Sequence, residues 1–140
     1  MPAWMIYALL SAFFAALTAV FAKAGLKNIN ADLATGVRTV FILIITWVII
    51  FTNRQQSGLA GLSKNNWLFL VLSAFATGLS WLFYYRALQV GKVSQVTVID
   101  KGSIVFTIFL SVIFLKEPLT LRLALGALLI FSGMLIVIWK

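Results

Sequence analysis

The sequence contains no cysteine and no histidine, and only three of its 140 residues are acidic. Without cysteine there can be no disulfides, and without either residue the usual zinc sites and the common nucleophile–base pairs are excluded. Three carboxylates leave little acid–base chemistry, so an enzyme is the least favoured class of protein. We expect no cofactor and no metal, and we assign no catalytic residue.

Charge of either sign is also scarce. Charged residues make up 10% of the chain and apolar residues 63%, whereas a typical soluble domain has roughly 25% charged residues. The 11 Lys and Arg residues give a formal net charge of +8, but they lie at the ends of apolar runs and do not cluster on one polar face, as a nucleic-acid-binding surface would. The composition therefore predicts a protein whose partner is the lipid bilayer and not nucleic acid.

The chain contains long apolar runs that suit helices crossing a membrane, which takes about 20 residues. We predict five transmembrane helices, at 4–22, 33–52, 67–88, 93–115 and 121–139. Gly58 and Gly61 indicate that the longest connection is irregular. The short connections leave no room for a soluble domain. The predicted fold class is an all-α integral membrane protein, with residues 1–140 forming a single transmembrane domain.

An odd number of spans places the two ends of the chain on opposite sides of the membrane. The basic residues near the span ends divide equally between the sides: Arg54, Lys64, Lys116 and Arg122 on the N-terminal side, and Lys23, Lys27, Lys92 and Lys140 on the other. Arg38, Arg86 and Lys101, just inside the spans, add only a weak bias towards a cytoplasmic second side. Both a single orientation with the N-terminus outside and dual insertion are compatible with this pattern.

Two of the predicted helices carry a stripe of polar residues. At 100° per residue, one face of the third helix collects Ser73, Thr77, Ser80 and Tyr84, and one face of the fourth collects Asp100, Ser103, Thr107 and Ser111. Because lipid offers a hydroxyl group no partner, we expect these faces to turn towards each other or towards a watery cavity. Each hydroxyl could line a transport pathway or form a hydrogen bond between helices.

Asp100 and Lys101 lie roughly 10 Å into the fourth predicted helix, at about 1.5 Å per residue. Ionisable groups at such depth are costly and usually functional. Neighbours on a helix point about 100° apart, so we expect each side chain to meet another helix, with Arg38 and Arg86 as possible partners of Asp100. Asp100 is predicted to carry a coupling proton or to hold a substrate group, its ionisation tuned by Lys101 or Arg38. A purely structural ion pair is the alternative.

Other polar residues near span ends have simpler expected roles. Arg86 lies opposite the polar stripe of the third helix, which favours a snorkelling anchor. Glu117 precedes Pro118 at the end of the fourth helix and is a possible gate or a cap of a turn. The fifth helix is almost wholly apolar, and its Gly126 and Gly133 share one face, which suits close packing and association.

Several segments together are similar to a known family. They are residues 21–26, 33–39 and 84–91, and above all Leu115 to Thr120 followed by Gly126 and Gly133. The chain resembles the EamA family of the drug/metabolite transporter superfamily. Residues 100–103, Asp-Lys-Gly-Ser, are similar to the Asp-Lys-x-Ser of its short, single-repeat members. The sequence lacks the proline that many full-length members carry early in the fourth span, so no kink is expected there.

The resemblance implies a transporter of small molecules, often an exporter, in the plasma membrane (the bacterial inner membrane). Typical members carry two inverted five-span repeats, so a single repeat implies a half that a second copy completes as a ten-helix antiparallel homodimer. In such an assembly the first four helices of each repeat surround a central path and the fifth helices assist association. Transport would proceed by alternating access.

The expected function is therefore secondary-active transport of a small solute, a metabolite or a drug-like compound. The predicted pathway or coupling residues are Asp100, Lys101, Arg38, Ser80, Trp81, Tyr84, Ser103 and Thr107. A cationic cluster of Lys23, Arg38 and Lys101 would favour an anionic or zwitterionic solute, whereas exposed Trp81, Tyr84 and Tyr85 would favour an organic cation or amphiphile. The alternative function is a non-transporting membrane subunit that stabilises or targets a larger complex.

Overall fold

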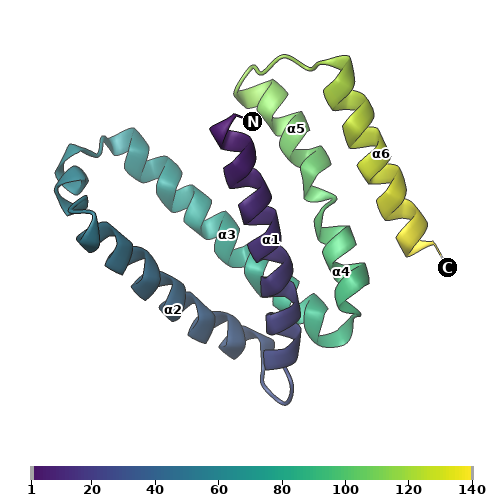
Figure 1. The fold of residues 1–140 in the computed structure, drawn as a ribbon, viewed down its shortest axis with the longest axis horizontal. Coiled ribbons are helices and arrows are strands. Elements are labelled where there is room, and N and C mark those ends of the chain that lie inside the picture. The colour runs from purple at the N-terminus through teal and green to yellow at the C-terminus, as the bar shows by residue number, and fades with distance from the viewer. Residues whose placement is uncertain (1, 140) are drawn as a thin grey trace. The chain divides into compact units, whose positions relative to one another are not determined.

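A computed structural model describes residues 2–139, and all of its regular elements are helical (Figure 1). They are α1 (Ala3–Gly25), α2 (Ala31–Thr52), the 3-10 helix η1 (Gln56–Gly61), α3 (Lys64–Val90), α4 (Val93–Asp100), α5 (Ser103–Phe114) and α6 (Leu121–Ile138). Five stretches are long and apolar enough to cross a membrane when α4 and α5 are taken together. The five predicted runs are thus confirmed as helices, with ends shifted by a few residues. Lys140, counted above among the flanking basic residues, lies outside the described part.

The described chain forms two compact units, which are treated separately below. The central unit is Val20–Val90, and the terminal unit comprises residues 2–19 and 91–139. Helix α1 is continuous and contributes its last residues to the central unit. Each unit therefore contains two of the predicted spans in full and a portion of α1.

Local hydrogen bonds set both ends of α2 in the central unit. The side chain of Asn30 accepts hydrogen bonds from the backbone N–H groups of Asp32 (2.8 Å) and Leu33 (3.3 Å), as a helix N-cap does. At the other end Arg54 adopts a left-handed conformation (φ 54°), and the backbone N–H of Gln55 then reaches back to the last turn of the helix. The helix therefore stops where the irregular loop was predicted.

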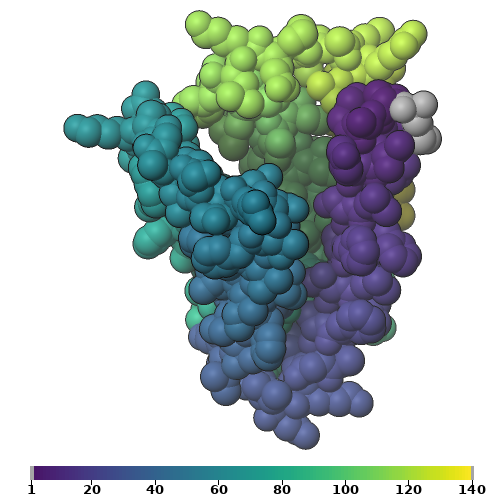
Figure 2. All heavy atoms as spheres, turned by 60° about the vertical axis from the view of Figure 1, so that its left-hand side comes forward, coloured from purple at the N-terminus to yellow at the C-terminus, as the bar shows by residue number. Residues whose placement is uncertain are grey.

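Helices α2 and α3 pack together mainly near one end. The buried side chains of this unit are Leu26, Ala31, Thr35, Tyr85 and Leu88. They lie near the start of α2 and the end of α3, and the two helices diverge towards η1 (Figure 1). The outer surface of α2 is uncovered in the view of Figure 2, which agrees with the exposure of apolar side chains such as Phe41. The packed core thus coincides with the end that carries the polar groups.

In the terminal unit, the fourth span is broken, although a continuous helix over 93–115 was predicted. Helix α4 ends at Asp100 and α5 begins at Ser103. Between them the backbone N–H of Gly102 donates to the carbonyl of Ile99, and that of Ile104 to the carbonyl of Lys101, at 2.9 and 3.0 Å. These bonds span three residues and not four, so the chain tightens into a 3-10 turn without any proline.

Close packing on α6 accompanies the break. Both α4 and α5 pack on α6, and a Cβ atom added to Gly102 would lie 2.7 Å from the sulfur of Met134. A larger residue here would therefore require the end of the Met134 side chain to move, whereas the backbone conformation of Gly102 (φ −57°) suits any residue. By contrast, a Cβ atom at Gly126 or Gly133 would meet nothing within 4 Å, so no described segment uses these two glycines for close packing. Their role in association stays a prediction.

Candidate functional site

Three hydroxyl groups of the two polar stripes donate hydrogen bonds within their own helices. Thr77 Oγ1 donates to the carbonyl of Ser73 at 2.8 Å, and Thr107 Oγ1 donates to the carbonyl of Ser103 at 2.9 Å. Ser111 Oγ similarly donates within α5, at 3.0 Å. Such bonds satisfy a hydroxyl whatever lies opposite it. The stripes therefore do not by themselves identify a pathway, and the placement of these faces towards each other or towards a watery cavity stays a prediction.

The stripe of α3 also differs from the face that packs on α2. Ser80 is exposed within the chain and Tyr84 is half-buried, whereas Tyr85 is buried. On α5, both Ser103 and Thr107 are exposed. Their predicted pathway roles stay predictions.

Arg38 meets aromatic rings on the face of α2 that packs against α3. Its guanidinium carbon lies 4.3 Å from the centre of the Trp81 ring and 5.6 Å from that of Tyr85. Tyr85 is only 4% exposed, so its position is fixed by packing. Two of the predicted site residues, Arg38 and Trp81, are therefore brought together, and Tyr85 joins them.

The energetic balance at Arg38 is informative. A cation–π contact contributes about 0.5–2 kcal/mol, whereas a charged side chain at the centre of a membrane helix costs about 2.5–3.5 kcal/mol. The rings therefore offset only part of the cost of an arginine placed in α2. A residue that is costly where it lies is a candidate for a functional role.

Asp100 pairs with its neighbour. A carboxylate oxygen of Asp100 lies 3.7 Å from Nζ of Lys101, so the prediction that the two would each meet another helix instead was wrong. That prediction rested on the angle between neighbours on a helix, but the long and flexible side chain of Lys101 spans this angle and reaches the carboxylate. Both side chains are substantially exposed, 37% and 50%, so the pair is loose.

Arg86 is tied to Asp32 by two parallel hydrogen bonds. Its Nε donates to Oδ1 at 2.8 Å and its Nη2 to Oδ2 at 2.7 Å. Arg86 was predicted to be a snorkelling anchor, and the structure gives it a fixed partner instead. Sequence reasoning assigned Asp32 to a loop and missed this pair. The available signal was an acid in the first turn of one helix and a base in the last turns of its neighbour on the same side of the membrane.

Further polar contacts surround this ion pair. Lys23 Nζ donates to the carbonyls of Leu88 and Gln89 at the end of α3, where helix carbonyls lack partners within the helix. The side-chain amide of Gln89 donates to the carbonyl of Ile29 at 3.0 Å. We call Lys23, Asp32, Arg86 and Gln89 the polar clasp. It joins the end of α3 to the end of α1 and the start of α2.

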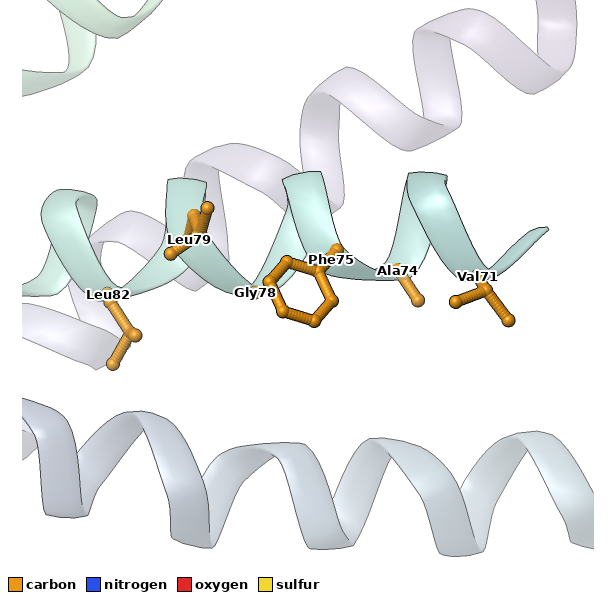
Figure 3. Close-up of a pocket in the computed structure, with 6 residues that line it drawn as sticks. All are labelled: Val71, Ala74, Phe75, Gly78, Leu79 and Leu82. Atoms are coloured by element: carbon orange, nitrogen blue, oxygen red, sulfur yellow. The ribbon is translucent and has the colours of Figure 1, made fainter. Parts of the chain in front are cut away.

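An apolar hollow lies farther along α3, centred on Gly78. It has a volume of about 430 Å³ and opens widely at the surface. Its lining residues are Val71, Ala74, Phe75, Gly78, Leu79 and Leu82 (Figure 3). Leu82 directly follows Trp81, so the hollow lies on the stretch of α3 next to the one that contacts Arg38. Its lining suits a hydrocarbon or aromatic group.

Glu117 belongs to the turn that ends α5. Its backbone N–H donates to the carbonyl of Ser111 at 3.3 Å, and the preceding Lys116 has a left-handed backbone (φ 55°). These are backbone features, so both the gate and the cap interpretation of the Glu117 side chain stay predictions. Within residues 2–139, no three side chains of the types that bind metals gather at one place.

Comparisons with known proteins cover almost the whole chain. The model of the EamA-like transporter family matches residues 2–139. A protein of Sinorhizobium sp named "Uncharacterized transporter in cobO 3'region" is 47% identical over 133 residues, which cover 95% of this chain and 94% of that protein. No solved structure matches the chain. The family, the relative and the five apolar helices support a multi-pass membrane transporter. The chain belongs to the EamA-like transporter family.

Proposed function

We propose that the protein is a secondary-active exporter of a small solute, working by alternating access as an antiparallel homodimer in the bacterial inner membrane. The observation that carries this proposal is the similarity in length between the chain and a relative named as a transporter, since the match covers 95% of one and 94% of the other. This agreement supports a transporter built from chains of this size. Because the chain resembles one half of a two-repeat transporter, we infer that a second copy completes it.

The second copy should insert upside down. Two repeats related by inversion give a site near the middle of the membrane that can open to either side. With an odd number of spans, a second chain has this relation only if its N-terminus lies on the opposite side of the membrane. The equal division of flanking basic residues supports such dual insertion, because no side is strongly favoured as cytoplasmic.

The exposed surface of the chain supports an assembly as well. Large apolar side chains such as Phe75 and Phe106 are each 71% exposed. In a membrane these surfaces meet lipid or another copy of the chain. In the proposed dimer, Arg38 and Trp81 contribute to substrate binding and Asp100 to coupling with protons. The pathway helices of the two copies would together enclose the solute.

Single-cysteine labelling tests the dual insertion, and the natural chain provides a background without cysteine. Lys64→Cys and Lys27→Cys place exposed thiols after the second and the first span. With a reagent that does not cross membranes, dual insertion predicts that each variant labels about equally from the two faces of intact membrane vesicles. A single orientation predicts labelling of the two variants from opposite faces, which would overturn the antiparallel dimer.

Transport itself is tested with purified protein in sealed vesicles loaded with a mixture of small metabolites. We expect a pH gradient to drive loss of at least one solute, followed by mass spectrometry, from vesicles with protein but not from empty vesicles. If no solute moves and gentle extraction instead recovers a stable complex with another membrane protein, the chain is a subunit and not a transporter.

A further inference from the structure

Arg38 is a cation without an anionic partner in its own unit. Asp32 is the sole acid between Val20 and Val90, and both of its oxygens accept hydrogen bonds from Arg86. The only described contacts of the Arg38 guanidinium are with the rings of Trp81 and Tyr85. Arg38 lies seven residues after the first residue of α2, about 10 Å along the helix. A charge at that depth is costly unless it is paired.

We propose that Arg38, held against Trp81 and Tyr85, binds the carboxylate of an organic-acid substrate. This inference rests on the proposed transport function and names the substrate class for the same site. A guanidinium group has five N–H donors in a planar fork that matches the two oxygens of a carboxylate. Contact with the two rings restrains that fork before the substrate arrives, which lowers the entropic cost of binding.

The same contacts argue against an organic cation. Trp81 and Tyr85 would be the natural cage for such a ligand, but Arg38 already lies over both rings. A cationic ligand would have to displace Arg38 and would meet its positive charge at close range. The sequence left anion and cation open, and the position of Arg38 favours the anion.

The neighbouring hollow indicates the remainder of the substrate. It is lined by apolar side chains, and Leu82 at its edge directly follows Trp81. A carboxylate at Arg38 and an apolar body on the adjacent stretch of α3 together describe an amphiphilic acid. A small aryl or alkyl carboxylate is a suitable probe.

The test compares three probes of similar size that differ in charge: 4-phenylbutyrate, 4-phenylbutanol and 4-phenylbutyltrimethylammonium. Binding to the full-length purified protein is measured by calorimetry at neutral pH. We expect the carboxylate to bind about tenfold or more tightly than the alcohol, as charge-assisted hydrogen bonds imply. Equal affinities, or tighter binding of the ammonium compound, would overturn the proposal.

Variants then test whether Arg38 is responsible for the tighter binding of the carboxylate. Arg38→Gln should abolish it, and Arg38→Lys should keep the charge but lose most of the affinity, since lysine lacks the fork. Arg54→Gln, in the distant loop after α2, removes the same charge and should change nothing. Circular dichroism and gel filtration establish that each variant is folded. Retention of the carboxylate preference by a folded Arg38→Gln protein would contradict the proposal.

Lipid phosphate is another possible source of an anion for Arg38. The titration is therefore repeated in phosphate-free maltoside micelles and in phospholipid nanodiscs. Similar carboxylate binding in both supports a solute site, whereas binding confined to micelles would show that lipid phosphate occupies Arg38 in the membrane. If the protein does not prefer the carboxylate probe but still transports a solute and labels from both faces, the proposed substrate class is wrong and the proposed function stands. If binding depends on Arg38 but no solute crosses the membrane, the binding site is supported and the transport function is rejected.

Discussion

The two ion pairs described above, one in each unit, differ in what they connect. In the central unit, Arg86 and Asp32 are 54 residues apart and share two short hydrogen bonds. In the terminal unit, Asp100 and Lys101 are neighbours in sequence, and their charged atoms lie 3.7 Å apart. The first pair connects two helices. The second pair connects two neighbouring residues, so it adds no contact between separate parts of the fold.

This difference separates structural from functional candidates. A bidentate pair between helices has optimal geometry for its own partner and leaves little for a ligand. A loose pair between neighbours costs little to break, so Asp100 keeps access to a proton or a substrate. We therefore regard Asp32–Arg86 as a structural link and Asp100 as the better candidate for coupling.

The largest expected effect is on coupling. In reconstituted vesicles, Asp100→Asn should abolish transport driven by a pH gradient, because the amide cannot take up or release the proton. Exchange of solute between the two sides without a gradient should persist. Arg54→Gln, which removes a charge in the loop after α2 and outside the predicted pathway, is the control and should retain driven transport. Full driven transport by Asp100→Asn would remove Asp100 from the coupling mechanism.

A smaller effect is expected from breaking the link in the central unit. Asp32→Asn and Arg86→Gln should each lower the midpoint of thermal unfolding in detergent, because the end of α3 loses a fixed contact with α2. The double exchange Asp32→Arg with Arg86→Asp should recover much of that loss, since it restores opposite charges across the same two helices. No recovery in the exchanged protein would mean that the pair is not a structural link.

The smallest effect concerns packing at the break in the fourth span. Gly102→Ala should destabilise the protein by less than about 1 kcal/mol, because its Cβ would lie 2.7 Å from the sulfur of Met134 and the end of this flexible side chain would have to move. Adding Met134→Ala should reduce that penalty. Gly126→Ala is the control and should be neutral or stabilising by up to about 1 kcal/mol, because alanine is the better helix former and its Cβ meets nothing within 4 Å. Reversible unfolding in mixed micelles measures all three, and equal losses at both glycines would contradict the close contact.

Much of the fold could be predicted from the sequence. The five apolar runs became helices because residues such as those between Leu33 and Thr52 are apolar throughout, and backbone groups in lipid must bond within their own segment. The break at Lys101 and Gly102 could not be predicted, since the local sequence has no proline. It accompanies the close approach of α6 at Met134, a residue more than 30 positions away.

The candidate site was only partly predictable. Arg38 and Trp81 were both selected, one as a charge inside a span and the other as an aromatic residue beside a polar stripe. Their contact could not be read from spacing, because it depends on how α2 rotates against α3. The pairing of Arg86 with Asp32 was not predicted for the same reason, because it also depends on how α2 and α3 pack.

By itself the sequence determined the membrane class, the number of spans and the odd parity that places the chain ends on opposite sides. These properties follow from the transfer of each segment into lipid, and that free energy depends mainly on the segment itself. Only the tertiary structure decided which charges pair. Side-chain partners are set by the rotation and register of packed helices, and many arrangements of the same apolar runs would satisfy the membrane equally well.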